Sequence, residues 1–289
     1  MAGLVPAIHV LRHGGIEGDK TMQDLMKGKR GLIMGIANDH SIAWGIAKTL
    51  AAQGAELAFT YQGEALGKRV RPLAEQLGVK LVLPCDVEDI ETVDAVFETL
   101  KATWGHLDFF VHAIGFTDKN ELRGRYADTT RDNFSRSMVI SCFSFTETAK
   151  RAAELMPESG GSIITLTFGG STRVMPNYNV MGVVKAALEA SVRYLALDFG
   201  RQKIRVNSIS AGPVRTLAGA VIGDSRTMFA FMQKHSPLGR GVTLEELGGS
   251  ALYLLSELSG GVTGETHFVD SGYNVISMPR PEDLKNTNE

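Results

Sequence analysis

Cysteine is nearly absent from this sequence of 289 residues, which contains only Cys85 and Cys142. Two cysteines so far apart support neither a disulfide framework nor a zinc site. We expect both to be reduced thiols in the core of a cytoplasmic protein, and we expect no metal centre.

An excess of one charge sign is also absent, because 30 Lys and Arg residues stand against 32 Asp and Glu residues. Such a balance gives no indication of a nucleic-acid partner or of a polybasic membrane contact. Long hydrophobic runs are lacking as well, since no stretch approaches the roughly 18 apolar residues that a membrane-spanning helix requires. We therefore expect neither nucleic acid nor membrane as a partner.

The two ends of the chain show little regular patterning. Leu4–Leu11 is apolar but short, and no small-residue cleavage site follows it in good context. A signal peptide is therefore a weaker interpretation than a disordered extension or an over-long start. We expect residues 1–27 to form an extension, residues 28–278 to form one domain, and the polar tail 279–289 to be frayed.

Between these ends the chain alternates short apolar or β-branched runs with longer helical periods. The candidate strands are Gly31–Ala37, Ala55–Tyr61, Val79–Pro84, Leu107–Ile114, Ser162–Phe168, Arg205–Ser210 and Thr266–Val269. The candidate helices include Ser41–Gln53, Ile90–Thr103, Arg131–Met156 and Tyr178–Phe199. This alternation is typical of right-handed βαβ units. It predicts the α/β class, with a single Rossmann-type doubly wound domain and a seven-stranded parallel sheet.

Ligands of such sheets bind beyond the carboxyl ends of the strands, at the topological switch point. After the first candidate strand, Gly35 permits a tight exit and Ser41 stands at the start of a helix, where N–H groups can face a pyrophosphate. Gly45 is expected to let that helix pack closely on the strand. The spacing is not Gly-x-Gly-x-x-Gly, so an ordinary loop with a serine N-cap remains an alternative.

Polar residues also follow the second and third candidate strands. Gln62 can bond the hydroxyls of an adenosine ribose, and no arginine follows at once to pair with a 2′-phosphate, which favours NADH over NADPH. Asp86 can accept from an adenine amino group, or it caps the next helix. His112 precedes the edge of the fourth strand by several residues, so we expect a structural histidine rather than a base.

Tyr178 and Lys185 lie seven residues apart in the candidate helix Tyr178–Phe199. This spacing is about two helical turns, or ~10 Å of rise, and places both side chains on one face. A lysine ammonium near a phenol favours the phenolate and so tunes a proton donor. Taken alone, the pair is better explained as an incidental Tyr and Lys on an exposed helix.

Three motifs together resemble the bacterial NADH-dependent enoyl-acyl-carrier-protein reductases, the divergent branch of the short-chain dehydrogenases/reductases. They are Tyr-x6-Lys, the start Gly-x5-Ser-Ile-Ala-x-Gly-Ile-Ala, and the string Ile209–Ala218. The resemblance runs from about Lys27 to Val275. The commoner branch would show Tyr-x3-Lys, but position 182 is Gly, and it would show Asn-Asn-Ala-Gly in place of residues 112–115.

The resemblance implies that NADH delivers a hydride to the β-carbon of a trans-2-enoyl thioester on acyl-carrier protein, in the last step of fatty-acid elongation. It implies Tyr178 and Lys185 as catalytic residues, a lid after Thr216 and a homotetramer. The implied cofactor contacts are Gly35, Ser41, Ile42, Gln62, Asp86, Val87, Ile114, Lys185, Val214, Thr216 and Ala218. The implied substrate contacts are Thr117, Phe168, Tyr178, Met181 and Arg226.

Two positions depart from the family pattern. Phe168 stands where most bacterial members carry a second tyrosine, and Arg226 is the one basic residue left of three that commonly meet the acidic carrier. These departures leave open an NADH-binding paralogue with weak catalysis that acts as a sensor or scaffold. A carbonyl reductase of the same fold is a second alternative, against which the Tyr-x6-Lys spacing and the missing Asn-Asn-Ala-Gly speak.

Overall fold

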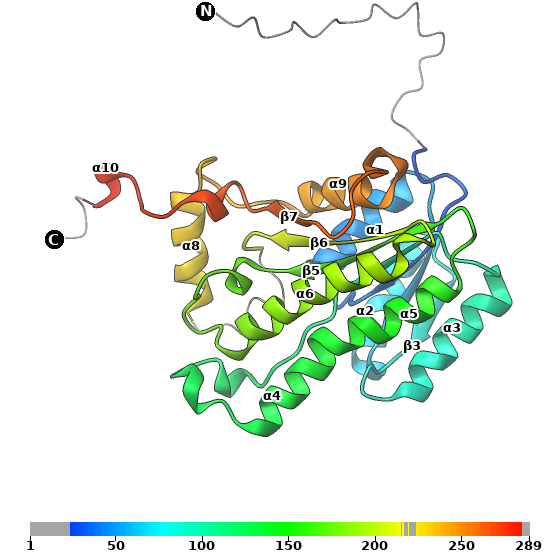
Figure 1. Ribbon diagram of the computed structural model, residues 1–289, viewed down its shortest axis with the longest axis horizontal. Helices are drawn as coiled ribbons and strands as arrows, with labels where there is room; N and C mark the ends of the chain where they lie inside the picture. Colours follow the sequence, from blue (N-terminus) through cyan, green and yellow to red (C-terminus); the bar gives the residue numbers. More distant parts are fainter. Residues whose placement is uncertain (1–23, 215, 217–218, 220–223, 285–289) are drawn as a thin grey trace, which may run out of the picture.

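The computed structural model describes residues 24–214, 216, 219 and 224–284 (Figure 1). Seven strands form one sheet in the order β3-β2-β1-β4-β5-β6-β7, and every neighbouring pair is parallel. The strands are β1 Arg30–Met34, β2 Glu56–Tyr61, β3 Leu81–Pro84, β4 Phe109–His112, β5 Gly161–Thr167, β6 Ile204–Ala211 and β7 Thr266–Val269. The predicted fold class is confirmed.

Helices cover both faces of the sheet. The α-helices are α1 Ile42–Ala52, α2 Gly63–Gln76, α3 Ile90–Trp104, α4 Arg131–Met138, α5 Ser144–Glu154, α6 Val180–Gly200, α8 Ser225–His235, α9 Leu244–Leu255 and α10 Pro281–Leu284. A π-helical segment, η3 (Val139–Phe143), joins α4 to α5. Short 3₁₀ turns are η1 Lys119–Glu121, η2 Tyr126–Asp128, η4 Gly169–Ser171, η5 Glu257–Ser259 and η6 Tyr273–Val275.

Two hydrophobic cores lie on opposite faces of the sheet. One packs α1, α2 and α9 against the strands, and the other packs α3, α5 and α6 against them. Because successive side chains of a strand point to opposite faces, Phe109 enters the first core and its neighbour Phe110 enters the second. Burial on both faces explains why the strands read as nearly continuous apolar runs in the sequence.

Two predicted helices differ from the structure. The stretch Arg131–Met156 is not one α-helix, because η3 interrupts it. The helix predicted from Tyr178 begins at Val180 instead, so the placement of Tyr178 within a helix was wrong. The reason is the backbone on either side of the tyrosine: Asn177 has a φ of 57° and Asn179 a φ of 37°, and asparagine tolerates such values better than most residues.

Gly45 serves a different contact from the one predicted. An ideal Cβ at Gly45 would lie 2.7 Å from the Cβ of Leu244, at the start of α9. An ideal Cβ at Gly248 of α9 would lie 2.1 Å from Oγ1 of Thr49 in α1. These two glycines therefore let α1 and α9 approach each other closely, and the predicted packing of Gly45 on the strand was wrong.

The ends of the described chain are packed. Met26 is buried and its N–H donates to the carbonyl of Gln53 at 2.9 Å, so the described body already includes residues 24–27. At the other end, Asp283 of α10 pairs with Lys234 at 3.1 Å and His235 at 3.4 Å. Figure 1 shows α10 beside α8 accordingly, so the first part of the tail is docked rather than frayed. No helix in the described part of the chain is long and apolar enough to cross a bilayer.

Candidate active site

The carboxyl ends of β1 and β4 meet at the switch point of the sheet, where β1 lies between β2 and β4. Gly35 leaves β1 with a φ of 102°. An ideal Cβ at this position would lie 2.1 Å from the carbonyl oxygen of Ala113, which follows β4. Only glycine fits a backbone that is both left-handed and so crowded. This agrees with the prediction that Gly35 permits a tight exit from the strand.

Ser41 occupies the N-cap position of α1, but its side chain does not cap the helix. The hydroxyl donates to the carbonyl of Asn38 at 2.6 Å and accepts from the N–H of Ala37 at 3.4 Å. Ser41 therefore shapes the turn that leads into the helix. The first N–H groups of α1, beginning at the half-buried Ile42, have no side-chain cap.

Gln62 and Asp86 meet across the ends of β2 and β3. The Nε2 atom of Gln62 donates to Oδ2 of Asp86 at 2.9 Å. The next helix, α3, is capped by Asp89, whose side chain accepts from the N–H of Glu91. The alternative of Asp86 as the helix cap was therefore wrong. Val87 follows it as a buried side chain.

Arg71 is a residue of this region that the sequence reasoning did not anticipate. Helix α2 carries its guanidinium back to the end of β2, 4.8 Å above the ring of Tyr61, where it donates to the Tyr61 hydroxyl at 2.6 Å. Glu64 accepts from the same guanidinium at 2.8 Å and 3.0 Å. The arginine that is missing directly after β2 is thus present in space, but it is paired with a carboxylate.

His112 is fully buried at the end of β4. Its ring nitrogens bond Oγ1 of Thr165 at 3.2 Å and Oγ of Ser144 at 2.9 Å. Burial, assisted by the nearby charge of Lys185, lowers the pKa of His112 to about 3, so the ring is neutral at pH 7. The prediction of a structural histidine is confirmed.

Lys185 projects from α6 into the buried side of the site. Its Nζ donates to the carbonyl of Leu166 at 2.8 Å, and only 8% of the residue is exposed. Burial lowers the pKa of this ammonium to about 8. An ideal Cβ at Gly115 would lie 4.0 Å from Nζ, so the loop after β4 also reaches this ammonium.

Tyr178 is buried beside Phe168, with ring centroids 5.2 Å apart in an edge-to-face arrangement. Burial, assisted by the charge of Glu189, raises the pKa of Tyr178 well above its ordinary value. The predicted shift towards the phenolate was wrong, because burial of the charged form and the charge of Glu189 both raise the pKa of Tyr178. Tyr178 is a protonated phenol that can donate a hydrogen bond.

Two glycines press against this tyrosine. An ideal Cβ at Gly170 would lie 2.6 Å from Cδ1 of Tyr178, and one at Gly182 would lie 2.8 Å from the carbonyl oxygen of Gly170. Position 182 is where a Tyr-x3-Lys motif would place its lysine. The backbone of η4 leaves no room there for a side chain, so the spacing to Lys185 has a steric reason.

The predicted substrate residues occupy different environments. Met181 is buried, Phe168 and Thr117 are half-buried, and Arg226 is exposed at the start of α8. The hydroxyl of Thr117 donates to Oδ1 of Asn133 at 3.1 Å.

Part of the predicted site lies outside the described residues. Val214 and Thr216 are half-buried, and Oγ1 of Thr216 accepts from the N–H of Gly219 at 2.9 Å. Ala218 and most of the predicted lid, residues 220–223, lie outside the described residues. The cofactor contact of Ala218 and the lid therefore remain predictions.

A buried carboxylate also escaped the sequence reasoning. Glu189 is 7% exposed and accepts from Oγ1 of Thr167, at the end of β5, at 2.6 Å. The sequence could have indicated this residue, because Glu189 stands four residues after Lys185, on the same face of a helix that is otherwise apolar there.

Among the described residues, no group of three or more His, Cys, Asp or Glu side chains could hold a metal ion.

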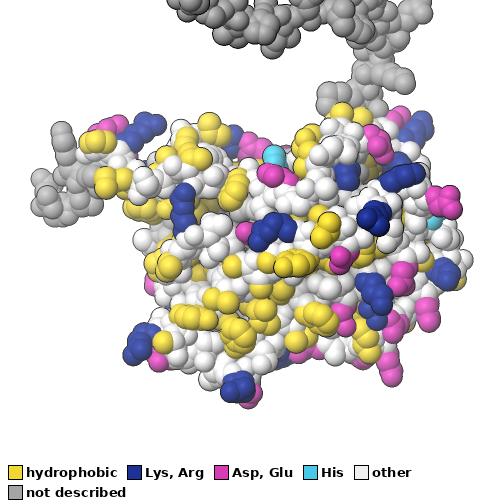
Figure 2. Space-filling view, in the orientation of Figure 1, with side chains coloured by type: hydrophobic (Ala, Val, Ile, Leu, Met, Phe, Trp, Pro, Cys, Tyr) yellow, Lys and Arg dark blue, Asp and Glu magenta, His cyan; other side chains and the backbone are white. Residues whose placement is uncertain are grey.

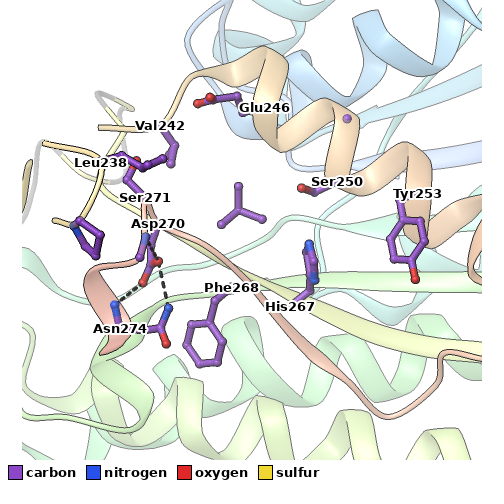
Figure 3. A pocket seen from close by; sticks show the side chains of 14 residues that line it. Leu238, Val242, Glu246, Ser250, Tyr253, His267, Phe268, Asp270, Ser271 and Asn274 are labelled. Atoms are coloured by element: carbon purple, nitrogen blue, oxygen red, sulfur yellow. Dashed lines mark hydrogen bonds between the residues drawn. The ribbon is translucent and has the colours of Figure 1, made fainter. Parts of the chain in front are cut away.

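A hollow of about 770 Å³ lies between α9 and the edge strand β7, and neither Tyr178 nor Lys185 lines it (Figure 3). Tyr253, His267 and Phe268 line it from these two elements. The carboxylate of Asp270 at its rim is already satisfied by the N–H groups of Gly272 and Asn274 and by the Asn274 side chain. None of the predicted site residues lines this hollow.

A parallel sheet with a glycine exit at its switch point, polar residues at successive strand ends and a buried Tyr–Lys pair defines a dinucleotide-binding oxidoreductase. The chain belongs to the enoyl-(acyl carrier protein) reductase family, whose sequence profile matches residues 35–274.

Two comparisons illustrate the membership. Over 264 residues the chain is 74% identical to NADH-dependent enoyl-acyl-carrier-protein reductase 2 of Rhizobium meliloti (strain 1021), covering 91% of this chain and 98% of that one. The crystal structure of FabI from Candidatus Liberibacter asiaticus has 60% identity and a TM-score of 0.88, and the match covers 90% of this chain and 100% of that one.

A third comparison involves a cofactor complex. The enoyl-acyl-carrier-protein reductase of Anaplasma phagocytophilum, solved in complex with NAD, is 59% identical with a TM-score of 0.86, over 89% of this chain and 98% of that one.

Proposed function

We infer that this chain reduces the 2,3-double bond of trans-2-enoyl thioesters on acyl-carrier protein with NADH, the last step of the fatty-acid elongation cycle. One observation carries this inference. Tyr178 and Lys185 are both buried, in a chain that is 74% identical to an NADH-dependent enoyl-acyl-carrier-protein reductase over nearly its whole folded length.

The residues at the carboxyl edge fit a dinucleotide. The exit at Gly35 brings the backbone against the end of β4, the start of α1 offers uncapped N–H groups to a pyrophosphate, and the Gln62–Asp86 pair offers an amide and a carboxylate to an adenosine. NADH bound here supplies the hydride. Its proposed contacts are Gly35, Ser41, Ile42, Gln62, Asp86, Val87, Ile114, Lys185, Val214, Thr216 and Ala218.

The Arg71–Glu64 pair supports NADH over NADPH. A 2′-phosphate needs an available cation near the adenosine ribose. The Arg71 guanidinium near Gln62 already has both of its Nη atoms engaged by the Glu64 carboxylate, at 2.8 Å and 3.0 Å. A phosphate would have to compete with this carboxylate and would be repelled by it.

We assign Tyr178 the role of hydrogen-bond donor to the thioester oxygen. Its raised pKa keeps the phenol protonated, so the hydroxyl can stabilise the negative charge that develops on this oxygen. One such donor is worth about 3 kcal/mol of transition-state stabilisation. Phe168 holds the ring from its edge but contributes no hydroxyl. Protonation of the α-carbon completes the reduction.

Lys185 has the role of holding the nicotinamide ribose. The carbonyl of Leu166 fixes the direction of its ammonium, and the remaining N–H groups can donate to ribose hydroxyls. The proposed substrate contacts are Thr117, Phe168, Tyr178, Met181 and Arg226. Among them, Arg226 is exposed and can meet an acidic carrier protein.

A homotetramer in the cytoplasm is the proposed working form. Figure 2 shows hydrophobic side chains gathered over the face of α4, η3 and α6. Tyr194 is 73% exposed, Leu197 78% and Phe143 53% on this face. Contiguous exposed apolar surface of this kind marks an interface. The unpaired edge of β7, beside the hollow of Figure 3, offers a second surface to another copy. The cytoplasmic location rests on the fatty-acid synthesis in which the family acts.

Loss of nicotinamide absorbance with defined thioesters tests the function. Purified chain and NADH are mixed with crotonyl and longer trans-2-enoyl thioesters, and in parallel with 3-ketoacyl thioesters. We expect turnover of the enoyl substrates only. Turnover of the 3-ketoacyl substrates alone would instead identify a carbonyl reductase, and binding of NADH without turnover of either would identify a catalytically weak paralogue.

A further inference from the structure

The helical arm formed by α4, η3 and α5 carries a row of buried polar side chains towards β4 and the loop after it. The row comprises Asn133, Ser137, Ser141 and Ser144, which are 7%, 0%, 0% and 1% exposed. Successive members are four, four and three residues apart, so they share one face of the arm. No step assigned above to Tyr178 or Lys185 uses these four residues.

The first two members hold the far part of the loop. Oδ1 of Asn133 accepts from the N–H of Asp118 at 3.0 Å and from the hydroxyl of Thr117 at 3.1 Å. The hydroxyl of Ser137 donates to Oγ1 of Thr117 at 2.9 Å. The last member, Ser144, bonds His112 within β4 itself.

Ser141 lies between them and holds a single residue of the loop by both of its backbone groups. Its Oγ accepts from the N–H of Phe116 at 2.8 Å and donates to the carbonyl of the same residue at 2.9 Å. The Phe116 ring is covered in turn by the guanidinium of Arg136, 4.5 Å from its centroid, and Glu88 holds that guanidinium at 2.7 Å and 2.8 Å.

The clamped residue adjoins the catalytic ammonium. An ideal Cβ at Gly115 would lie 4.0 Å from Nζ of Lys185 and 4.0 Å from Oγ of Ser141. Gly115 therefore lies between these two side chains, directly before the clamped Phe116 and directly after Ile114. Ser141 itself sits in η3, and single π-helical turns within α-helices occur frequently at functional sites.

We propose that Ser141 is a positioning residue of the reductase: its hydroxyl fixes the backbone of Phe116, and thereby Gly115 beside Lys185, in the conformation that receives the nicotinamide half of NADH. The proposal rests on the proposed function for the identity of the cofactor. A merely structural serine would only satisfy the buried backbone groups of Phe116, and its loss would lower stability without a specific effect on the cofactor.

Ser162 provides a matched control. It is also a buried serine, 1% exposed, and its hydroxyl donates to the carbonyl of Leu254 at 2.8 Å. It lies in the second position of β5, near the amino end of the strand, whereas the cofactor residues follow the carboxyl ends. Ser162→Ala therefore removes a comparable hydrogen bond far from the site.

The test measures the dissociation constant of NADH by fluorescence titration and the urea midpoint of unfolding, on the full chain without thioester. We expect Ser141→Ala to raise the dissociation constant about tenfold, the equivalent of one buried hydrogen bond, and to expose the Phe116 amide to hydrogen exchange. Ser162→Ala should lower the urea midpoint similarly and leave the dissociation constant within twofold of wild type. Ser141→Thr, which keeps the hydroxyl, should restore most of the affinity.

Two results would overturn the proposal. The first is a dissociation constant of NADH that stays unchanged in Ser141→Ala although the Phe116 amide exchanges faster. The second is a loss of NADH affinity in Ser162→Ala that equals the loss in Ser141→Ala. If Ser141→Ala does not fold, Asn133→Ala removes the bonds from Thr117 and Asp118 to Oδ1, leaves the bond from Ser137 to Thr117, and should raise the dissociation constant about threefold; no change there counts against the proposal. Wild-type chain that binds NADH but reduces no enoyl thioester refutes the proposed function alone, whereas wild type that binds no NADH refutes both.

Discussion

In the proposed mechanism Tyr178 donates to the thioester without help from its neighbour, because Phe168, whose ring centroid lies 5.2 Å away, has no hydroxyl. We expect Tyr178→Phe to lower kcat by a hundredfold or more, roughly the effect of losing one preorganised donor. The dissociation constant of NADH should stay near that of wild type. Steady-state kinetics with an enoyl thioester check this, and near-normal turnover of the variant would refute it.

A reciprocal variant sharpens this test. Phe168→Tyr adds a hydroxyl at the ring that faces Tyr178, so the double variant Phe168→Tyr/Tyr178→Phe should recover part of the lost turnover. If both double and single variants are equally inactive, the hydroxyl has to project from Tyr178 itself.

Lys185 should give NADH binding a pH dependence near neutrality. Burial lowers its pKa to about 8 in the cofactor-free chain, from 10.5 in the unfolded chain. The ammonium proposed to bond the ribose is therefore present below pH 8 and is lost as the pH rises through 8. We expect the dissociation constant of NADH to increase above pH 8, approaching tenfold per pH unit. Fluorescence titrations between pH 6.5 and roughly 9.5 measure it.

The matching control is Lys185→Met, which removes the titrating group. Its binding of NADH should be weak and independent of pH over the same interval. A wild-type profile that is equally flat would mean that the charge on Lys185 does not contribute to binding.

Arg226 should matter only for substrate on its carrier. The residue is exposed and forms no ion pair with the described part of the chain. We expect Arg226→Glu to raise KM for the carrier-bound enoyl substrate several-fold more than KM for the CoA thioester. The control is Lys101→Glu, which makes the same change of charge at an exposed residue of α3. It should leave both KM values unchanged. An equal rise for both thioesters in Arg226→Glu would exclude a carrier contact.

A residue of the candidate site was predictable from the sequence only where it stands directly after the end of a strand. Gly35, Gln62 and Asp86 belong to this group, since the carboxyl ends of parallel strands share one edge. Ser141 and Arg71 do not, because helices bring them to the site from positions 25 residues beyond Phe116 and nine beyond Gln62. Their partners are backbone groups or residues on other elements, which no local pattern specifies.

At the scale of elements, the contact between α1 and α9 depends on glycine. An ideal Cβ at Gly248 would lie 2.1 Å from Thr49 Oγ1 and 3.0 Å from the carbonyl oxygen of Gly45. We expect Gly248→Ala to lower the free energy of unfolding by about 1–3 kcal/mol, because the helices must separate. Urea denaturation monitored by circular dichroism measures this change.

The neighbouring glycine supplies the control within the same helix. An ideal Cβ at Gly249 meets nothing within 4 Å. Gly249→Ala should therefore stabilise the chain by up to about 1 kcal/mol through helix propensity. If both substitutions had the same effect, helix propensity rather than the α1–α9 contact would govern the response.

Element types were more predictable than their interruptions. Periodicity identified all seven strands to within a few residues at each end, and the signal is strongest in the central runs β1, β4, β5 and β6, which are mostly buried. The π-helical turn of η3 and the late start of α6 were missed. The first depends on tertiary contacts of Ser141 and Ser144, and the second on the positive φ values of Asn177 and Asn179, which the hydrophobic pattern does not report.

At the scale of the whole molecule, the exposed apolar face of α4, η3 and α6 should be covered by other copies of the chain. Leu197, 78% exposed, lies within that face. We expect Leu197→Glu to convert a tetramer into smaller species, because it would place charges in the apolar interface. Sedimentation velocity measures the mass distribution.

Val174 is the control for this substitution. It is 97% exposed but lies in the loop between η4 and α6, not on one of the helices of that face. Val174→Glu should leave the mass distribution unchanged. A wild-type chain that sediments as a monomer would contradict the proposed tetramer directly.

The glycine at position 182 limits how this protein can evolve. Its Cα faces the carbonyl oxygen of Gly170, and an added Cβ would lie 2.8 Å from that oxygen. A single substitution that introduced lysine here would displace η4 and the adjoining Tyr178 ring rather than create the shorter Tyr–Lys spacing. In this chain the shorter Tyr–Lys spacing is therefore more than one substitution away. The backbone at 169–171 would have to move first, so the seven-residue spacing is protected by a residue that has no side chain.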